Sequence, residues 1–380
     1  MIKIGVLALG KKDSGGVYQY TQSIIDALKK DKTKIHIIFC NKDENFYDNC
    51  GLEVRKVNKP KTNLIEKFVR VLQFLFFIRR SWFFTQNEKA EFLDIDLFLA
   101  PQISPYPHFF INKPFVFTLH DMQERYYPEN FSKFENALRW LVNRALARSA
   151  DKIICESTFV KNDIVKFTGV NEVKINIIQS PPPEIFLNYN FEEKQFNAVR
   201  EKYNLPENFI FYPAQCWPHK NHIKLVEAFE IISKQIDDVY LILTGSQMNN
   251  YNNLMQRIDE LNLKDKVKHL GYIDYNDLPY LYKMSKFLVM PTLFESISIP
   301  IYEAFALEVA VCSSNAVALT EQVGDAGIMF NPNDSGDIAH KMMMYLSDDS
   351  LRNEKAKLGL ERVKDFNHKS YKIKLLKVLN

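Results

Sequence analysis

KFLVMPTLFESISIPIYEA, residues 286–304, is the stretch that decides the fold class of this chain. Its beginning, residues 286–291, is rich in aliphatic and β-branched side chains and ends at Pro291, which is typical of a buried parallel strand. After Ser298 the apolar residues recur at helical spacing, and Pro300 is tolerated in a first helical turn. A strand that leads through a short turn into a helix is the building unit of α/β folds with parallel sheets.

Two glutamates eight positions apart mark this turn as a candidate site. Glu295 lies on the turn, and Glu303 lies about one and a half turns inside the predicted helix. The free N–H groups and the dipole of a helix N-terminus favour an anion such as phosphate. Two carboxylates beside it could hold sugar hydroxyls on either side of a pyrophosphate. Alternatively, Glu295 is a solvated loop residue and Glu303 is a surface helix residue.

The same alternation of strand and helix continues along the chain and predicts parallel sheets with helices on both faces. Ser180 and three prolines after it form a stiff, hinge-like segment. We therefore expect two Rossmann-like domains across a cleft, residues 1–183 and 184–365, with a last helix at about 366–380 packing back on the first. The predicted strands cover 2–8, 35–40, 95–100, 115–119, 152–155, 209–213, 239–244, 267–270, 286–291 and 310–313.

Composition is that of an ordinary globular protein of 380 residues, with 46% hydrophobic residues, 25% charged residues and a net charge of +3. The five cysteines are scattered without a Cys-x-x-Cys pair, which suits a reducing compartment and argues against a disulfide framework or a zinc site. No signal-peptide pattern or membrane-spanning apolar run is found. We expect a cytoplasmic protein.

Three more strand ends carry candidate residues. Gly15-Gly16 opens a predicted helix and could let backbone approach a phosphate or sugar, or could be a flexible turn. His120 follows an apolar strand and could donate to a sugar hydroxyl or transfer a proton, whereas in the alternative Asp121 caps a helix and His120 is merely exposed. Lys220, near a helix start after residues 209–213, suits a pyrophosphate.

Metal sites are disfavoured by the spacing of the available ligands. His219 and His222 are three residues apart at a turn, with no clear third ligand. Asp94-Ile95-Asp96 has the Asp-x-Asp spacing of metal-dependent enzymes, but it opens an apolar strand and reads better as a solvated strand entrance. We expect no metal or other cofactor.

Residues 55–90 hold nine Lys and Arg and two Glu, a net charge of +7. Within them, residues 64–84 combine a basic stripe with bulky aromatic residues. Such a helix could lie in an anionic membrane surface, or it could pack on the core with its basic stripe in solvent. Nucleic-acid binding is disfavoured because the region lacks a reading module.

Taken together, these motifs resemble the retaining glycosyltransferases of family 4, which have the two-domain GT-B fold. The resemblance implies a nucleotide-sugar donor held mainly by the C-terminal domain, transfer with retention of anomeric configuration, and no metal requirement. It runs over most of the chain, through the Gly15-Gly16 loop, His120-Asp121, ICESTFVKNDIVK (154–166), PHKNH (218–222), FESISIPIYEA (294–304) and TEQVGDAGIMFNP (320–332).

The resemblance also implies roles for single residues. His120 would contact the transferred sugar, Lys220 the diphosphate, and Glu295 the sugar near the reacting centre, which makes these three the catalytic residues. Glu303 would bind the ribose, and Glu321 would start a helix near the nucleotide. Backbone around the phosphate would come from Gly15, Gly16, Ser296, Ile297, Ser298 and Ile299.

Two departures from the family pattern affect the diphosphate. Pro213-Ala214 stands where the family has Gly-Arg, so one phosphate contact is missing or replaced by Gln215 or His219. Ser296 and Ser298 stand where the family has glycines.

The resemblance predicts a hexosyltransferase that acts on a glycan or lipid-linked acceptor in bacterial surface polysaccharide assembly, in the cytoplasm or peripheral on the inner face of the membrane. The alternatives are a catalytically silent sugar-nucleotide-binding partner and a GT-B-fold sugar-nucleotide epimerase.

Overall fold

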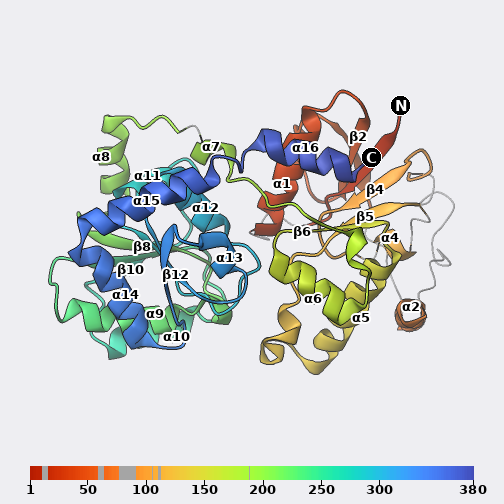
Figure 1. The fold of residues 1–380 in the computed structure, drawn as a ribbon. Coiled ribbons are helices and arrows are strands. Elements are labelled where there is room, and N and C mark those ends of the chain that lie inside the picture. Colours follow the sequence, from red (N-terminus) through yellow and green to blue (C-terminus); the bar gives the residue numbers. More distant parts are fainter. Residues whose placement is uncertain (11–15, 59–63, 77–90, 105, 110–112, 188) are drawn as a thin grey trace. The chain divides into compact units, whose positions relative to one another are not determined.

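A computed structural model of the chain describes all residues except 11–15, 59–63, 77–90, 105, 110–112 and 188 (Figure 1). The chain divides into two compact units. The N-terminal unit comprises Met1–Ser180 and also the last segment, His368–Asn380. The C-terminal unit comprises Pro181–Asn367. The chain thus leaves the first unit at the Ser-Pro-Pro-Pro segment and returns to it with its last helix.

The N-terminal unit is built on a seven-stranded sheet with the order β3-β2-β1-β4-β5-β6-β7, in which every pair is parallel. Its strands are β1 (Lys3–Leu7), β2 (Ile35–Asn41), β3 (Glu53–Val57), β4 (Leu97–Ala100), β5 (Phe115–Thr118), β6 (Lys152–Cys155) and β7 (Ile175–Ile177). Its helices are α1 (Gly16–Lys29), α2 (Leu64–Leu75), α4 (Tyr106–Phe109), α5 (Lys133–Ser149), α6 (Thr158–Thr168) and α16 (His368–Val378).

Successive residues of these strands feed two separate cores, because side chains alternate between the faces of a sheet. Ile153 joins the core beneath α5 and α6, whereas its neighbour Ile154 joins the core beneath α1 and α16. Tyr371 and Leu375 bring α16 into that second core. Strands buried on both faces explain the continuous apolar runs in the sequence.

The C-terminal unit has a six-stranded parallel sheet with the order β10-β9-β8-β11-β12-β13. Its strands are β8 (Phe209–Pro213), β9 (Tyr240–Thr244), β10 (Val267–His269), β11 (Leu288–Met290), β12 (Val311–Ser314) and β13 (Gly327–Phe330). Its helices are α7 (Glu184–Leu187), α8 (Glu193–Lys202), α9 (His222–Ser233), α10 (Tyr251–Glu260), α11 (Leu278–Met284), α12 (Ile299–Ala306), α13 (Leu319–Val323), α14 (Ser335–Ser347) and α15 (Asp349–Val363).

Two parallel sheets with their helices confirm the predicted α/β class. Three strands, β3, β7 and β13, were not predicted, and each lies at the edge of its sheet. An edge strand has one neighbour and is less buried, so it lacks the continuous apolar run that marks a central strand. The segment EVRKV of β3 shows this, since only its last residue is buried.

Candidate active site

Lys220 and Glu295 meet at the carboxyl ends of two adjacent strands of the C-terminal unit. Lys220 ends a one-turn helix between β8 and α9, and Glu295 lies on the turn between β11 and α12. The Lys220 ammonium donates to Glu295 Oε2 at 2.5 Å. Each side chain keeps 18% of its surface exposed, so the ion pair is open to a ligand. The structure therefore brings together two residues that lie 75 positions apart in the sequence.

The loops that carry this ion pair are fastened to each other by Asn221. Its backbone is left-handed, with φ 60°, a conformation that asparagine tolerates better than most residues. The buried Asn221 amide donates to the carbonyls of Pro291, at 2.9 Å, and Pro332, at 2.8 Å. The carbonyl of His219 accepts from the backbone N–H of Leu293 at 2.8 Å. Lys220 therefore sits on a segment whose neighbours on both sides are fixed.

The turn before α12 is held by Gln322 of α13. Its side-chain oxygen accepts from the Ser298 N–H at 2.8 Å, and its side-chain nitrogen donates to the Ser298 carbonyl at 2.6 Å. The Ser298 N–H, one of the groups assigned to the phosphate, is thus already paired. Ser296, Ile297 and Ile299 are half-buried.

The hydroxyl of Ser298 is buried and has no hydrogen-bond partner among the residues that the structure describes. It lies directly before the first residue of α12. An unpaired buried hydroxyl is costly unless a ligand satisfies it. With the helix N-terminus, it marks this turn as a place for an anion.

Glu303 is neither a solvated surface residue nor an open carboxylate. It is 2% exposed, and Oε2 accepts from the Tyr282 hydroxyl of α11 at 2.6 Å. Burial raises the pKa of Glu303 to about 7, although the hydrogen bond from Tyr282 acts in the opposite direction. Glu303 therefore changes its charge near neutral pH.

Glu321 lies on α13 and its side chain is exposed. Arg362 of α15 donates to the carbonyls of Glu321 and Gln322, each at 2.7 Å. These bonds fix the helix that also holds the Ser298 turn.

In the N-terminal unit, Gly16 is the exposed first residue of α1, and Gly15 lies outside the described residues. His120 lies two residues beyond β5. Its Nδ1 is 3.1 Å from Glu156 Oε2, and its Nε2 is 2.8 Å from the Pro101 carbonyl oxygen. Both ring nitrogens are therefore paired within this unit.

The residues near Ala214, which stands where the family has arginine, supply no second positive charge. The Gln215 side-chain oxygen accepts from the indole of Trp217 at 2.9 Å. Burial, helped by the charge of Lys220, lowers the pKa of His219 to about 3. His219 is uncharged at neutral pH and can offer a diphosphate only a hydrogen bond. Lys220 is the only Lys or Arg in residues 214–222.

The other candidate metal ligands have protein partners. Asp94 forms ion pairs with Lys3, at 2.9 Å, and Arg55, at 2.7 Å, and these hydrogen bonds hold its pKa far below the usual range. Asp96 accepts from the Lys3 N–H at 2.9 Å. His222 is fully buried and donates to the Ala214 carbonyl. Throughout the described residues, no three His, Cys, Asp or Glu side chains gather as a metal site would require.

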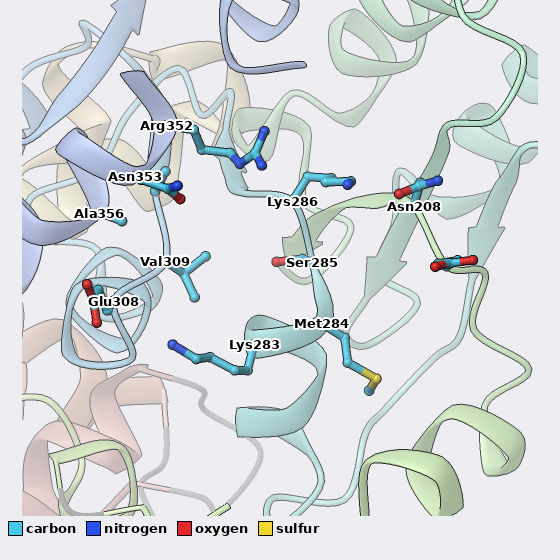
Figure 2. A pocket seen from close by; sticks show the side chains of 12 residues that line it. Asn208, Lys283, Met284, Ser285, Lys286, Glu308, Val309, Arg352, Asn353 and Ala356 are labelled. Carbon is cyan, nitrogen blue, oxygen red and sulfur yellow. The ribbon is translucent and has the colours of Figure 1, made fainter. Parts of the chain in front are cut away.

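One pocket of the C-terminal unit lies at the opposite ends of its strands (Figure 2). It has a volume of about 370 Å³, and its walls include Asn208, Lys286 and Ala310, which precede β8, β11 and β12. Lys283 at its rim donates to the Leu307 carbonyl at 2.9 Å. Parallel α/β sheets bind ligands at the carboxyl ends of their strands, so this pocket is not the candidate site.

Helix α2 exposes apolar side chains. Ile65, Phe68 and Phe76 are 74%, 65% and 69% exposed, whereas Phe74 is 4% exposed. The remainder of the basic stretch, residues 77–90, lies outside the described residues. Within the described part of the chain, every helix is too short or too polar to cross a membrane.

Four residues that build these sites were not predicted. Asn221 and Gln322 lie inside the quoted motifs PHKNH and TEQVGDAGIMFNP, and Glu156 directly follows a predicted strand, so a signal existed for each. No sequence signal indicated Tyr282, because its role depends on how α11 packs against α12.

Two family models match this chain, one on each unit. The model of Glycosyltransferase Family 4 matches residues 14–181, and that of Glycosyl transferases group 1 matches residues 193–361. Among solved structures, HepE from Anabaena in complex with UDP and glucose has a TM-score of 0.79 at 19% identity, covering 100% of this chain and 99% of that one.

Several curated relatives are named as mannosyltransferases. O-antigen chain mannosyltransferase B of Escherichia coli is 33% identical over 171 residues, 44% of this chain and 45% of that protein. The match to the E. coli mannosyltransferase WbdA spans 28% of its length, so this chain matches less than half of either relative. O-antigen chain mannosyltransferase RfbU of Salmonella typhimurium is 25% identical over 338 residues, 87% of each chain.

The two parallel-sheet units and the structural likeness to HepE show the GT-B fold. With a matching model on each unit, the chain belongs to the family 4 type of these enzymes, as the sequence motifs predicted.

Proposed function

We propose that this protein transfers a hexose, most simply mannose, from a nucleotide-diphosphate donor to a glycan or lipid-linked acceptor during assembly of a bacterial surface polysaccharide. The names of the matched O-antigen mannosyltransferases support the sugar and the pathway class. The UDP-glucose bound by HepE supports the donor class. The observation that carries the proposal is the Lys220–Glu295 ion pair beside the α12 N-terminus.

In this proposal the donor diphosphate replaces Glu295 as the ion-pair partner of the Lys220 ammonium. Negative charge grows on the leaving phosphate as the glycosidic bond breaks, and a fixed ammonium stabilises that charge more than it stabilises the ground state. The N-terminus of α12 and the Ser298 hydroxyl add hydrogen-bond donors. Glu295, freed from its partner, contacts the transferred sugar.

Glu303 holds the ribose in the same proposal. Its contact does not change during the reaction, so it contributes equally to ground-state and transition-state binding. We therefore expect Glu303→Ala to raise the donor KM and Glu295→Ala to lower kcat. The same pattern in both variants would refute this division of roles.

Retention follows if the departing phosphate accepts the proton of the acceptor hydroxyl on the face that it leaves. No residue then has to act as a base, and Lys220 with the helix N-terminus supplies the charge that a metal would otherwise provide.

We further propose that α2 meets an anionic membrane that carries the acceptor. Ile65 and Phe68 of α2 are exposed neighbours on one helical face, because they are three residues apart, and the exposed Phe76 directly follows the helix. Aromatic burial and the net charge of +7 in residues 55–90 would both favour an anionic bilayer. Phe68→Ser should weaken co-sedimentation with anionic vesicles. Phe134→Ser, at a 71% exposed position on α5, is the matched control.

Protein that stays in the supernatant with anionic vesicles at low salt would exclude this surface. Equal losses in the two variants would exclude a specific role for α2.

A nucleotide-sugar panel tests the proposed function. The protein is incubated with UDP-, GDP- and dTDP-hexoses and with glycan acceptors, and free nucleotide, product and product anomer are measured. We expect turnover of one donor with retention, and a large loss in Lys220→Ala. Binding without transfer would indicate a silent partner, and conversion of the donor to its epimer would indicate an epimerase.

A further inference from the structure

His120 is held between the ends of the two strands that flank its own. Strand β5 pairs with β6, and the register Thr118↔Ile154 continues to His120 beside Glu156. On the other side β5 pairs with β4, and the residue after β4 is Pro101. Fold topology therefore places a carboxylate against one nitrogen of the ring, at 3.1 Å, and a carbonyl against the other, at 2.8 Å.

These two partners select one state of the ring. A carbonyl oxygen only accepts, so Nε2 must carry a hydrogen. The Glu156 carboxylate also accepts from the Ser180 hydroxyl at 2.8 Å. An ionised carboxylate beside Nδ1 requires a second hydrogen on the ring, because two lone pairs would otherwise face each other. His120 is then an imidazolium.

We propose that Glu156 is a positioning residue that holds His120 as a fixed cation, so that His120 serves the transfer reaction by its charge and not as a proton acceptor. This inference rests on the proposed function and on the contact between His120 and the transferred sugar that the family resemblance implies. With both N–H groups engaged by Glu156 and Pro101, the ring has no lone pair to accept a proton. The edge of Tyr20, at 4.6 Å between ring centroids, fixes its remaining side.

The electrostatics of the site agree with this geometry. Burial acts to lower the pKa of His120, but the hydrogen bond and charge of Glu156, the Pro101 carbonyl and the charge of Asp121 outweigh it and raise the pKa. The Tyr20 hydroxyl, bonded to Thr118 at 3.0 Å, is itself buried and its pKa is far above the usual range, so it brings no charge.

The state of the ring can be measured directly. Wild-type protein is labelled with ¹⁵N-histidine, and the His120 signal, one of eight, is assigned by its loss in His120→Asn. Both ring nitrogens should be protonated at pH 7. In Glu156→Gln the ring should be neutral at pH 7, and Glu156→Asp, which keeps the carboxylate, should retain the charge. Ser180→Ala keeps the Glu156 carboxylate, so the ring should remain charged at pH 7.

Kinetics then connect the ring to the reaction. In Glu156→Gln, kcat at pH 7 should fall by the same factor as the charged fraction of the ring found by the titration, and it should recover as the pH is lowered. A neutral wild-type ring at pH 7, an unchanged titration in Glu156→Gln, or a kcat profile that does not follow the titration would each overturn the proposal. Absence of turnover with any donor would refute the proposed function, while the ring titration would still decide the role of Glu156.

Discussion

Replacing the buried Glu303 by glutamine should make the stability of the C-terminal unit less dependent on pH. The Glu303 carboxyl keeps its proton in the folded chain up to a pKa of about 7, against an ordinary value of 4.5. Between these two pH values the folded chain binds more protons than the unfolded chain, so stability falls as pH rises. The pKa shift of Glu303 contributes about 3 kcal/mol to the free energy of unfolding. About 2.5 kcal/mol of this is lost between pH 5 and pH 8.5.

The glutamine side chain does not titrate, so the Glu303→Gln variant should not lose stability in this way as pH rises. Its side-chain oxygen can still accept from the Tyr282 hydroxyl, which lies 2.6 Å from Glu303 Oε2. Its NH₂ group is a new buried donor and adds a cost of about 1–3 kcal/mol, but that cost does not vary with pH. The prediction therefore concerns the difference between variant and wild type, which should move in favour of the variant as pH rises.

Thermal unfolding at a series of pH values measures this difference. For a domain of this size, 1 kcal/mol shifts Tm by about 2–4 °C, so the gap between variant and wild type should change by roughly 5–10 °C from pH 5 to pH 8.5. Glu207→Gln, at an exposed glutamate of the same unit, is the matched control and should leave the gap constant. A constant gap in Glu303→Gln as well would show that Glu303 is ionised in the folded chain and refute the reasoning.

Other variants test single features of the site. Lys220→Ala should lower kcat by about 10²–10³-fold, the usual effect of removing one charge stabiliser, and Lys224→Ala on the adjacent α9 should not; near-normal turnover would remove Lys220 from the site. Tyr282→Phe leaves Glu303 without its hydrogen bond and should raise the donor KM more than it changes kcat, so an unchanged KM would contradict the role of the pair. Val317, with φ 40°, occupies a backbone conformation that is strained for a β-branched residue, so Val317→Gly should raise Tm by about 1–4 °C, and a lower Tm would show that the loop is unstrained. Transfer activity should survive excess EDTA, whereas a loss restored by Mg²⁺ or Mn²⁺ would show that a metal is needed.

Parallel topology places Lys220 and Glu295 at the same edge of the sheet, but their contact also depends on β8 lying beside β11, and these strands are not consecutive in the chain. Both residues follow buried strands with clear apolar runs, and the carboxyl ends of neighbouring parallel strands lie at one edge of a sheet. The edge strand β3 (EVRKV) escaped prediction because it lacks that apolar signal, whereas β7 and β13 are short, with three and four residues.

The surroundings of Glu303 and His120 could not be predicted in the same way. Whether a glutamate inside a helix is exposed depends on the rotation of that helix against its neighbour, and here α12 turns Glu303 toward Tyr282 of α11. His120 does lie at a strand end, as the sequence indicated. Its ring partners follow β4 and β6, the strands next to β5 in both the sequence and the sheet, but no local pattern shows that the Pro101 carbonyl and the Glu156 carboxylate reach the ring.

The donor site carries less positive charge than the family pattern leads one to expect, and this shapes how it can bind a diphosphate. Lys220 is a single cation, and in the absence of a ligand Glu295 already neutralises it. His219 cannot add a second charge, because its pKa is about 3. Under the proposed function, the remaining stabilisation must come from groups without a full charge, namely the partial positive charge of the α12 N-terminus and the unpaired Ser298 hydroxyl. Serine at position 298, where the family has glycine, then compensates in part for alanine at position 214, where the family has arginine.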